Sequence, residues 1–148
     1  MKRLSVATAL MLMCCFATNA MARTAAINSR DLGAIRKVLD EQAAAWNRGD
    51  IDGYMEGYAR GDDTMFVGTT VNRGWQTVRD RYRTKYDTPA KMGKLDFSDL
   101  ALRPLGGDDV VVTGAWELTR EADKPHGRFT LIFHRTAAGW RIVYDHSS

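Results

Sequence analysis

The sequence predicts an α+β domain in which three N-terminal helices pack in the concave face of a curved mixed or antiparallel sheet, forming a cone-shaped barrel. Between residues 29 and 86, apolar residues recur mainly at steps of three and four, which is the helical period. From residue 92 onward they recur at steps of two, which is the strand period. Within residues 127–148, two such runs flank the turn Thr136–Gly139 and predict an antiparallel hairpin.

The first 22 residues are predicted to be a cleaved export signal that precedes this domain. Lys2 and Arg3 come before a mostly apolar run, and Ala20-Met21-Ala22 fits a small-x-small cleavage site. The run is shorter than the roughly 20 residues that a membrane span needs. We therefore expect cleavage after Ala22, a periplasmic or secreted location, and a mature protein of residues 23–148 that forms one domain and does not span a membrane.

Cleavage would change the chemistry that the protein has available. It removes both cysteines, Cys14 and Cys15, and with them disulfides, thiol nucleophiles and thiolate metal sites. It also removes Lys2 and Arg3 from the 21 basic residues, so that the net charge falls from +3 to +1 against 18 acidic residues. A nearly neutral chain without a basic run argues against nucleic-acid binding.

The first predicted helix begins near Ser29 and Asp31 and ends before Arg48-Gly49-Asp50. Gly49 is favoured just past a helix end, and Asp50 can cap the start of the next helix. One stripe of this helix faces the core. Its residues are Ile35, Val38, Leu39, Gln42, Ala43 and Trp46.

Two further helices are expected before the sheet. The second runs from Ile51 to about Arg60 and carries Tyr54 and Tyr58 on one face, because residues four apart are neighbours on a helix. The third covers residues 75–86 and ends before Pro89, which cannot continue a helix.

The remaining segments are predicted to be strands and turns. Residues 64–68 form a short strand, and residues 72–74 turn the chain toward the third helix. The alternation in residues 95–103 leaves the inward face ambiguous and suggests a switch at a bulge. Residues 110–119 form a strong strand, in which Gly114 permits a bend or a close approach.

The closing hairpin has one predicted inward face. In its second strand, Trp140, Ile142, Tyr144 and His146 share that face, because side chains alternate along a strand. An apolar row that ends in an ionisable group is typical of a pocket mouth and equally of a strand that runs out into solvent. Asp145 is predicted to point the opposite way, unless the strand twists at its end.

Several motifs resemble the nuclear transport factor 2-like superfamily, and more narrowly its SnoaL-like, polyketide-cyclase-like branch. The matching segments cover nearly all of residues 23–148: Ala43–Tyr54 with its Trp-x-x-Gly-Asp helix exit, Asp63–Gly68, Gly74-Trp75, Gly127–Arg135 and Gly139–Ser147. The resemblance implies a cystatin-like cone of helices over a curved sheet, a pocket between the two layers, and frequent dimerisation through the outer face of the sheet.

The resemblance leaves two functions open, because one fold serves many activities. The first is an exported protein with a hydrophobic pocket for a small apolar or carbonyl-containing molecule, with metal-free isomerase, cyclase or dehydratase chemistry as its enzymatic form. The second is a non-catalytic homodimeric association domain that binds a protein partner. Neither requires a cofactor.

Three residues are candidates for catalysis. His146 can act as an acid or base near neutral pH, or can hold the last strand through a backbone carbonyl. Tyr54 could donate a hydrogen bond to a substrate carbonyl, a role that Tyr82 shares. Asp63 is the nearest candidate base, although an aspartate there also fits an ordinary turn.

Six residues are candidates for ligand binding. They are Trp46, Tyr58, Tyr82, Phe97 and Trp116 as pocket wall, and Arg128 as an anion clamp. Arg128 and Phe129 are adjacent in a strand and point to opposite faces, which favours a solvated or dimer-face position for Arg128. No metal site is expected, because His126, His134 and His146 lack ligand-like spacing. A second set of residues is predicted to point to the outer face of the sheet, where it fits a dimer surface. Its members are Glu117, Thr130, Ile132, His134 and Val143.

Overall fold

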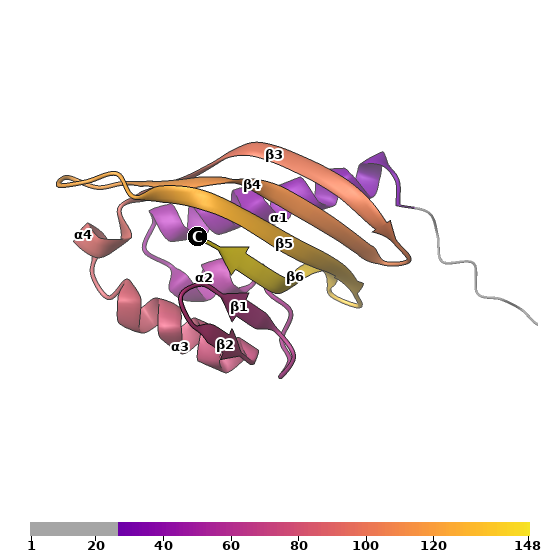
Figure 1. The fold of residues 1–148 in the computed structure, drawn as a ribbon, viewed down its shortest axis with the longest axis horizontal. Helices are drawn as coiled ribbons and strands as arrows, with labels where there is room; N and C mark the ends of the chain where they lie inside the picture. The colour runs from indigo at the N-terminus through magenta and orange to yellow at the C-terminus, as the bar shows by residue number, and fades with distance from the viewer. Residues whose placement is uncertain (1–26) are drawn as a thin grey trace, which may run out of the picture.

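The computed structural model describes residues 27–148, so the predicted export signal and its cleavage site lie outside the described residues (Figure 1). Four helices and six strands follow one another in this part of the chain. In order they are α1 (Ser29–Asn47), α2 (Ile51–Met55), β1 (Met65–Val67), β2 (Val71–Arg73), α3 (Trp75–Lys85), α4 (Pro89–Met92), β3 (Lys94–Gly106), β4 (Asp109–Thr119), β5 (His126–Thr136) and β6 (Gly139–Ser147).

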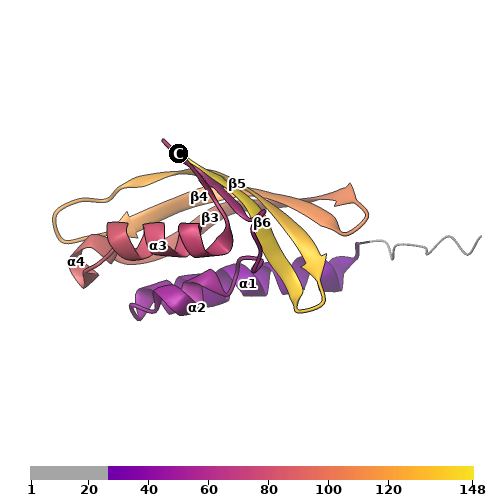
Figure 2. The ribbon, with the colours of Figure 1, turned by 90° about the horizontal axis from the view of Figure 1, so that it is seen from below.

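The strands form one curved six-stranded sheet in the order β2-β1-β6-β5-β4-β3, and the helices cover one of its faces (Figure 2). Neighbouring strands are antiparallel except β1 and β6, which pair in parallel. The edge strands β2 and β3 do not pair with each other, so the sheet stays open. This arrangement confirms the predicted α+β class and the mixed sheet.

Helix α1 begins and ends as its sequence predicts. Asn28 caps it, with its side chain accepting from the backbone of Asp31 while the Asp31 side chain accepts from the backbone of Asn28. Gly49 follows the helix with φ +80°, a conformation that glycine adopts without a steric penalty. Ile35, Leu39, Gln42 and Trp46 are buried, which confirms the stripe that faces the sheet.

Helix α2 is shorter than predicted, because it ends at Met55 rather than near Arg60. Beyond Met55 the backbone bonds to the sheet: Ala59 N–H donates to the Ile142 carbonyl at 2.8 Å, and Ile142 N–H donates to the Gly57 carbonyl at 2.9 Å. These tertiary hydrogen bonds replace those of a longer helix, and they place Tyr58 beside β6.

The segment between α2 and β3 holds two differences from the prediction. Residues 71–73 are strand β2, which pairs with β1, so the predicted turn at residues 72–74 is wrong. Helix α3 ends at Lys85 as the approach of Pro89 predicts, but Pro89 then opens the short helix α4. Proline is well tolerated at a first helical position, because its missing N–H would have no partner there.

Two predictions about β3 and β4 are confirmed. The pairing of these strands shifts between Ser98 and Ala101, where Asp99 adopts φ +54°, so β3 does switch faces at a bulge. In β4, a Cβ added to Gly114 would lie 2.5 Å from the Phe129 ring. Glycine therefore lets this ring pack directly against the β4 backbone.

A second bulge, in β6, overturns the predicted inward face of the last strand. Phe133 pairs with Ile142, but Ile132 pairs with Tyr144, so Val143 is an extra residue on β6. Inward positions are therefore Ile142 and then Asp145. Asp145 is only 2% exposed, whereas His146 is exposed. The prediction that His146 points inward and Asp145 outward is wrong, because strict alternation does not survive a bulge.

Candidate functional site

A cavity of about 360 Å³ lies between the helices and the concave face of the sheet. Its wall is largely aromatic, and residues from α1, α2, α3 and five strands or their ends contribute to it. The aromatic lining residues are Trp46, Tyr54, Tyr58, Phe66, Tyr82, Tyr86, Phe97, Trp116 and Phe129. A concave, mainly apolar cavity of this size suits a small organic molecule.

One buried carboxylate, that of Asp145, lies in this wall. The Tyr58 hydroxyl donates to its Oδ2 at 2.6 Å, and the Ser147 hydroxyl donates to its Oδ1 at 2.6 Å. Asp145 and Ser147 are brought to the same face by their spacing after the β6 bulge. Tyr58 reaches them from the segment that bridges to Ile142.

Three tyrosine hydroxyls continue the polar chain away from Asp145. The oxygen atoms of Tyr58 and Tyr82 lie 3.2 Å apart, and those of Tyr82 and Tyr54 lie 3.4 Å apart. All three side chains are buried and line the cavity. The carboxylate is thereby linked through hydroxyl groups to helices α2 and α3.

Burial sets the protonation of this network. Loss of hydration raises the pKa of Asp145 above its ordinary value, although hydrogen bonds from Ser147 and Tyr58 and the charges of Arg81 and His146 partly oppose the rise. Burial, and then the charge of Asp145, raise the pKa of Tyr54 and of Tyr58. The tyrosines are therefore neutral donors, while Asp145 can hold or release a proton.

The backbone around the network is held by buried hydrogen bonds. The Gln42 side chain donates to the Tyr54 carbonyl at 2.9 Å, and a Cβ added to the neighbouring Gly57 would lie 2.4 Å from the Gln42 side chain. The Trp46 indole donates to the Met92 carbonyl at 3.2 Å. These contacts hold α1 against α2 and α4.

Six predicted site residues lie in the wall of this cavity. They are Trp46, Tyr54, Tyr58, Tyr82, Phe97 and Trp116. The structure brings them together because α1, α2 with the segment after it, α3 and the inward faces of β3 and β4 converge there. Their individual roles in binding or catalysis stay predictions.

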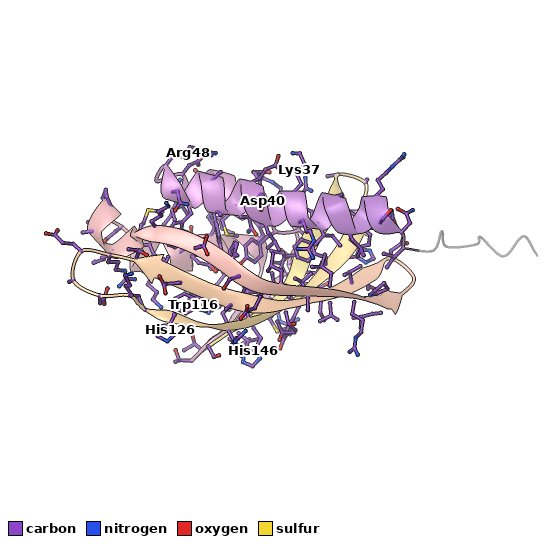
Figure 3. All side chains as sticks on the ribbon, turned by 90° about the horizontal axis from the view of Figure 1, so that it is seen from above. Lys37, Asp40, Arg48, Trp116, His126 and His146 are labelled. Atoms are coloured by element: carbon purple, nitrogen blue, oxygen red, sulfur yellow. The ribbon has the colours of Figure 1, made fainter. Side chains whose placement is uncertain are left out.

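Two predicted residues lie outside the cavity lining, and a third, His146, lines the cavity from an exposed position. Asp63 is fully exposed and lies 3.7 Å from Arg73, outside the cavity lining, because it belongs to the turn before β1. Arg128 is exposed and pairs with Asp99 at 3.0 Å on the β5 face that points away from the helices. His146 is exposed although it lines the cavity, and Figure 3 shows it on the side of the sheet away from α1.

Sequence reasoning missed Asp145 as the inward acid. The signal that could have found it is Val143-Tyr144, two adjacent large residues that break the alternation of β6. Such a pair is typical of a bulge, after which inward and outward positions exchange. It also missed Arg81 and Lys85, which line the cavity from α3.

Within residues 27–148, no group of three or more histidine, aspartate or glutamate side chains is arranged to hold a metal ion. Among the same residues, no helix is both long enough and apolar enough to cross a membrane.

Comparisons with known proteins agree with this fold. The profile of the SnoaL-like domain family matches residues 35–148. An NTF2-like protein of unknown function from Shewanella oneidensis is 34% identical, with a TM-score of 0.75, and the match covers 79% of this chain and 98% of that one. No match was found among curated proteins.

Two more distant structures share the fold. An NTF2-like protein of unknown function from Pseudomonas putida is 17% identical, with a TM-score of 0.70 over 83% of this chain and 89% of that one. A protein of unknown function with a cystatin-like fold from Nostoc punctiforme is 12% identical, with a TM-score of 0.68 over 82% and 92%. These findings confirm the resemblance identified from the sequence.

Proposed function

Because the chain belongs to the SnoaL-like domain family of the NTF2-like superfamily, whose members include ligand binders, isomerases and cyclases, we propose that it binds a small carbonyl-containing molecule in its cavity and can move a proton on it. The observation that carries this proposal is Asp145, a buried carboxylate in an aromatic wall. Its two oxygen atoms accept hydrogen bonds from hydroxyl groups only, and each keeps a lone pair for another partner.

The arrangement supports metal-free acid/base chemistry. The carboxylate of Asp145 accepts a proton from the carbon beside the carbonyl group, and Tyr54 or Tyr82 donates a hydrogen bond to the oxygen as negative charge develops there. Return of the proton to a different carbon completes an isomerisation. Asp145 thus takes the role that the sequence suggested for His146, while His146 at the rim contacts the outer part of a ligand.

The cavity favours this reading over a purely associative domain. An association domain would fill the space between helices and sheet with side chains, whereas about 360 Å³ is open here. As the mature form would be exported, the ligand is expected to be met in the periplasm or outside the cell.

Native mass spectrometry of the purified protein tests binding directly, because a retained ligand adds a defined mass. Proton transfer is tested with a β,γ-unsaturated cyclic ketone in D₂O, by following deuterium uptake and double-bond migration in NMR spectra. We expect Asp145→Asn to lower the rate by about 100-fold or more, the usual contribution of a general base. Tyr58→Phe should lower it less.

The control is Asp40→Asn, an exposed change on the solvent side of α1 (Figure 3). It removes the same charge far from the cavity and should leave the rate unchanged. Equal rates for the wild type and Asp145→Asn would refute the catalytic part of the proposal. Absence of both bound ligand and ketone binding would refute the binding part.

A second proposal concerns the outer face of the sheet, where we infer a homodimer contact. The strand register places Val111, Ile132, Tyr144 and Met65 in one row across four strands, and all four are half-buried. Native mass spectrometry should show a dimer, and Ile132→Lys should shift it to a monomer. A wild type that is monomeric at micromolar concentration would contradict this assignment.

A further inference from the structure

Helix α3 carries four basic residues, and they divide into two pairs by helical spacing. Arg79 and Arg83, four residues apart, both bind the carboxylate of Asp52 in α2, at 2.6 Å and 2.5 Å. Arg81 and Lys85, also four residues apart, line the cavity instead. The first pair holds α3 against α2, and its positive charges are paired with the carboxylate of Asp52.

The second pair has no such partner. Between residues 27 and 148, no carboxylate lies within 4.0 Å of Arg81 or Lys85. The Arg81 guanidinium lies 3.8 Å from the centre of the Phe66 ring, and the Lys85 ammonium lies 5.4 Å from that of Tyr86. Both rings belong to the cavity wall, so the cations lie where the aromatic surface meets solvent.

Among the lysine, arginine, histidine, aspartate and glutamate side chains that line the cavity, most are basic. His146 contributes a third basic group from β6, and Asp145 is the one acidic side chain that lines the cavity in the described part of the chain. Asp145 is buried within the wall, whereas Lys85 and His146 are exposed and Arg81 is half-buried. A ligand that enters therefore meets apolar rings inside and positive charge at the opening.

We propose that the natural ligand is an amphipathic carboxylate, whose apolar body lies among the aromatic rings and whose carboxylate is bound at the opening by Arg81 and Lys85. This inference depends on the proposed binding function and specifies its ligand class. The planar guanidinium of Arg81 can bind a carboxylate with two parallel hydrogen bonds, and its stacking on Phe66 orients it in advance.

A matched pair of probes tests the ligand class. 2-Naphthaleneacetic acid is a flat aromatic carboxylate, and 2-naphthaleneacetamide has nearly the same shape without the charge. We expect titration calorimetry at neutral pH to give about tenfold tighter binding for the acid, the advantage of a charge-assisted hydrogen-bonded pair. Arg81→Gln should remove most of this preference, because it weakens binding of the acid more than binding of the amide.

Two further variants separate charge from packing. Arg81→Lys keeps the charge but loses the planar stacking, and should retain part of the preference for the acid. Arg36→Gln removes one exposed positive charge from α1, outside the cavity lining, and should change neither affinity. Melting temperatures of all variants verify that each is folded.

The outcomes distinguish this inference from the proposed function. Equal affinities for acid and amide in the wild type would overturn the carboxylate assignment while leaving a binding cavity. An acid preference that survives Arg81→Gln together with Lys85→Gln would overturn the role of these two residues. Binding of neither probe, with no ligand retained after purification, would refute the proposed binding function itself.

Discussion

Two buried aspartates in this fold have opposite surroundings. Asp31, at the start of α1, is 7% exposed, and its Oδ1 binds the Arg135 guanidinium at 2.6 Å and the Trp140 indole N–H at 3.3 Å. Asp145, in the cavity wall, is 2% exposed and is bound by two hydroxyl groups. One carboxylate has a cationic partner in contact, and the other has neutral partners.

The pKa values of the two carboxyls diverge accordingly. Hydrogen bonds from Arg135 and from the Asn28 backbone lower the pKa of Asp31 to about 2, whereas burial raises that of Asp145. Arg135 also binds Asp108 and lies over the Trp140 ring, so the Asp31–Arg135 pair joins the start of α1 to the β3–β4 turn and to the β5–β6 hairpin. The comparison shows how one domain lowers the pKa of one buried carboxyl with a cationic partner and raises that of another by burying it without one.

The largest difference in stability should appear when the carboxyl of Asp31 and that of Asp145 are each replaced by an amide. We expect Asp31→Asn to lower the melting temperature by roughly 5 °C, because the Arg135 contact loses its negative partner. Asp145→Asn should not lower it at neutral pH, since an amide escapes the cost of a buried charge. Circular dichroism measures both. Equal losses for the two variants would refute the distinction.

The pH dependence of stability should separate the same residues. The folded-state pKa of Asp31 is below its ordinary value of 3.8, so its contribution is present above pH 3.8 and is lost as the pH falls toward about 2. For Asp145 the folded-state pKa is raised, so the free energy of unfolding falls as the pH rises above 3.8.

Urea unfolding between pH 2.5 and 7 measures these slopes. Asp31→Asn should flatten the acid limb, and Asp145→Asn should flatten the decline above pH 3.8. Asp40→Asn, which removes an exposed carboxyl, serves as the control and should leave both limbs in place. A wild-type decline that Asp145→Asn leaves intact would assign it to another group.

A smaller effect is expected from Tyr58→Phe. It removes the hydroxyl that donates to Asp145 at 2.6 Å, which should cost about 1–2 kcal/mol of unfolding free energy. It should also raise the pKa of Asp145 further, because this hydrogen bond favours the charged form. Carbon-13 NMR titration of the carboxyl group measures the pKa, and a fall would contradict the assigned donor.

The smallest effect should come from Ser147→Ala. Its hydroxyl donates to the other oxygen of Asp145 at 2.6 Å, but Ser147 is only half-buried, so water can replace the hydroxyl. We expect a loss of about 1 kcal/mol or less, with the pKa of Asp145 again raised. A loss larger than that of Tyr58→Phe would show that the serine dominates the support of the carboxylate.

The fold could be predicted from sequence where periodicity was unbroken. The stripe from Ile35 to Trp46 and the alternation in residues 110–119 correspond directly to α1 and β4. β2 was missed, because Val71-Asn72-Arg73 offers a single apolar residue and depends on pairing with β1. Short elements that owe their existence to tertiary pairing leave little trace in sequence.

The residues of the cavity wall could be predicted from the sequence, but the buried carboxylate of Asp145 could not. Tyr54, Tyr58 and Tyr82 were identified from helical spacing, although α2 ends at Met55 and Tyr58 lies in the segment that bridges to β6. The choice between Asp145 and His146 depended on one extra residue, Val143, which reverses every later side chain in β6. Alternation along a strand predicts which side chains point inward only as far as the next bulge.

The parallel pairing of β1 with β6 has a kinetic consequence. Met65 pairs with Tyr144, and Tyr58 with Ile142, so each of these contacts joins residues that are far apart in the sequence. Closing such long loops costs conformational entropy before the contacts can form. The folding time is therefore expected to be on the order of milliseconds to seconds. The hairpin of β5 and β6 can form early from local contacts. The cavity, which needs α2, α3, β1 and β6 together, should assemble last.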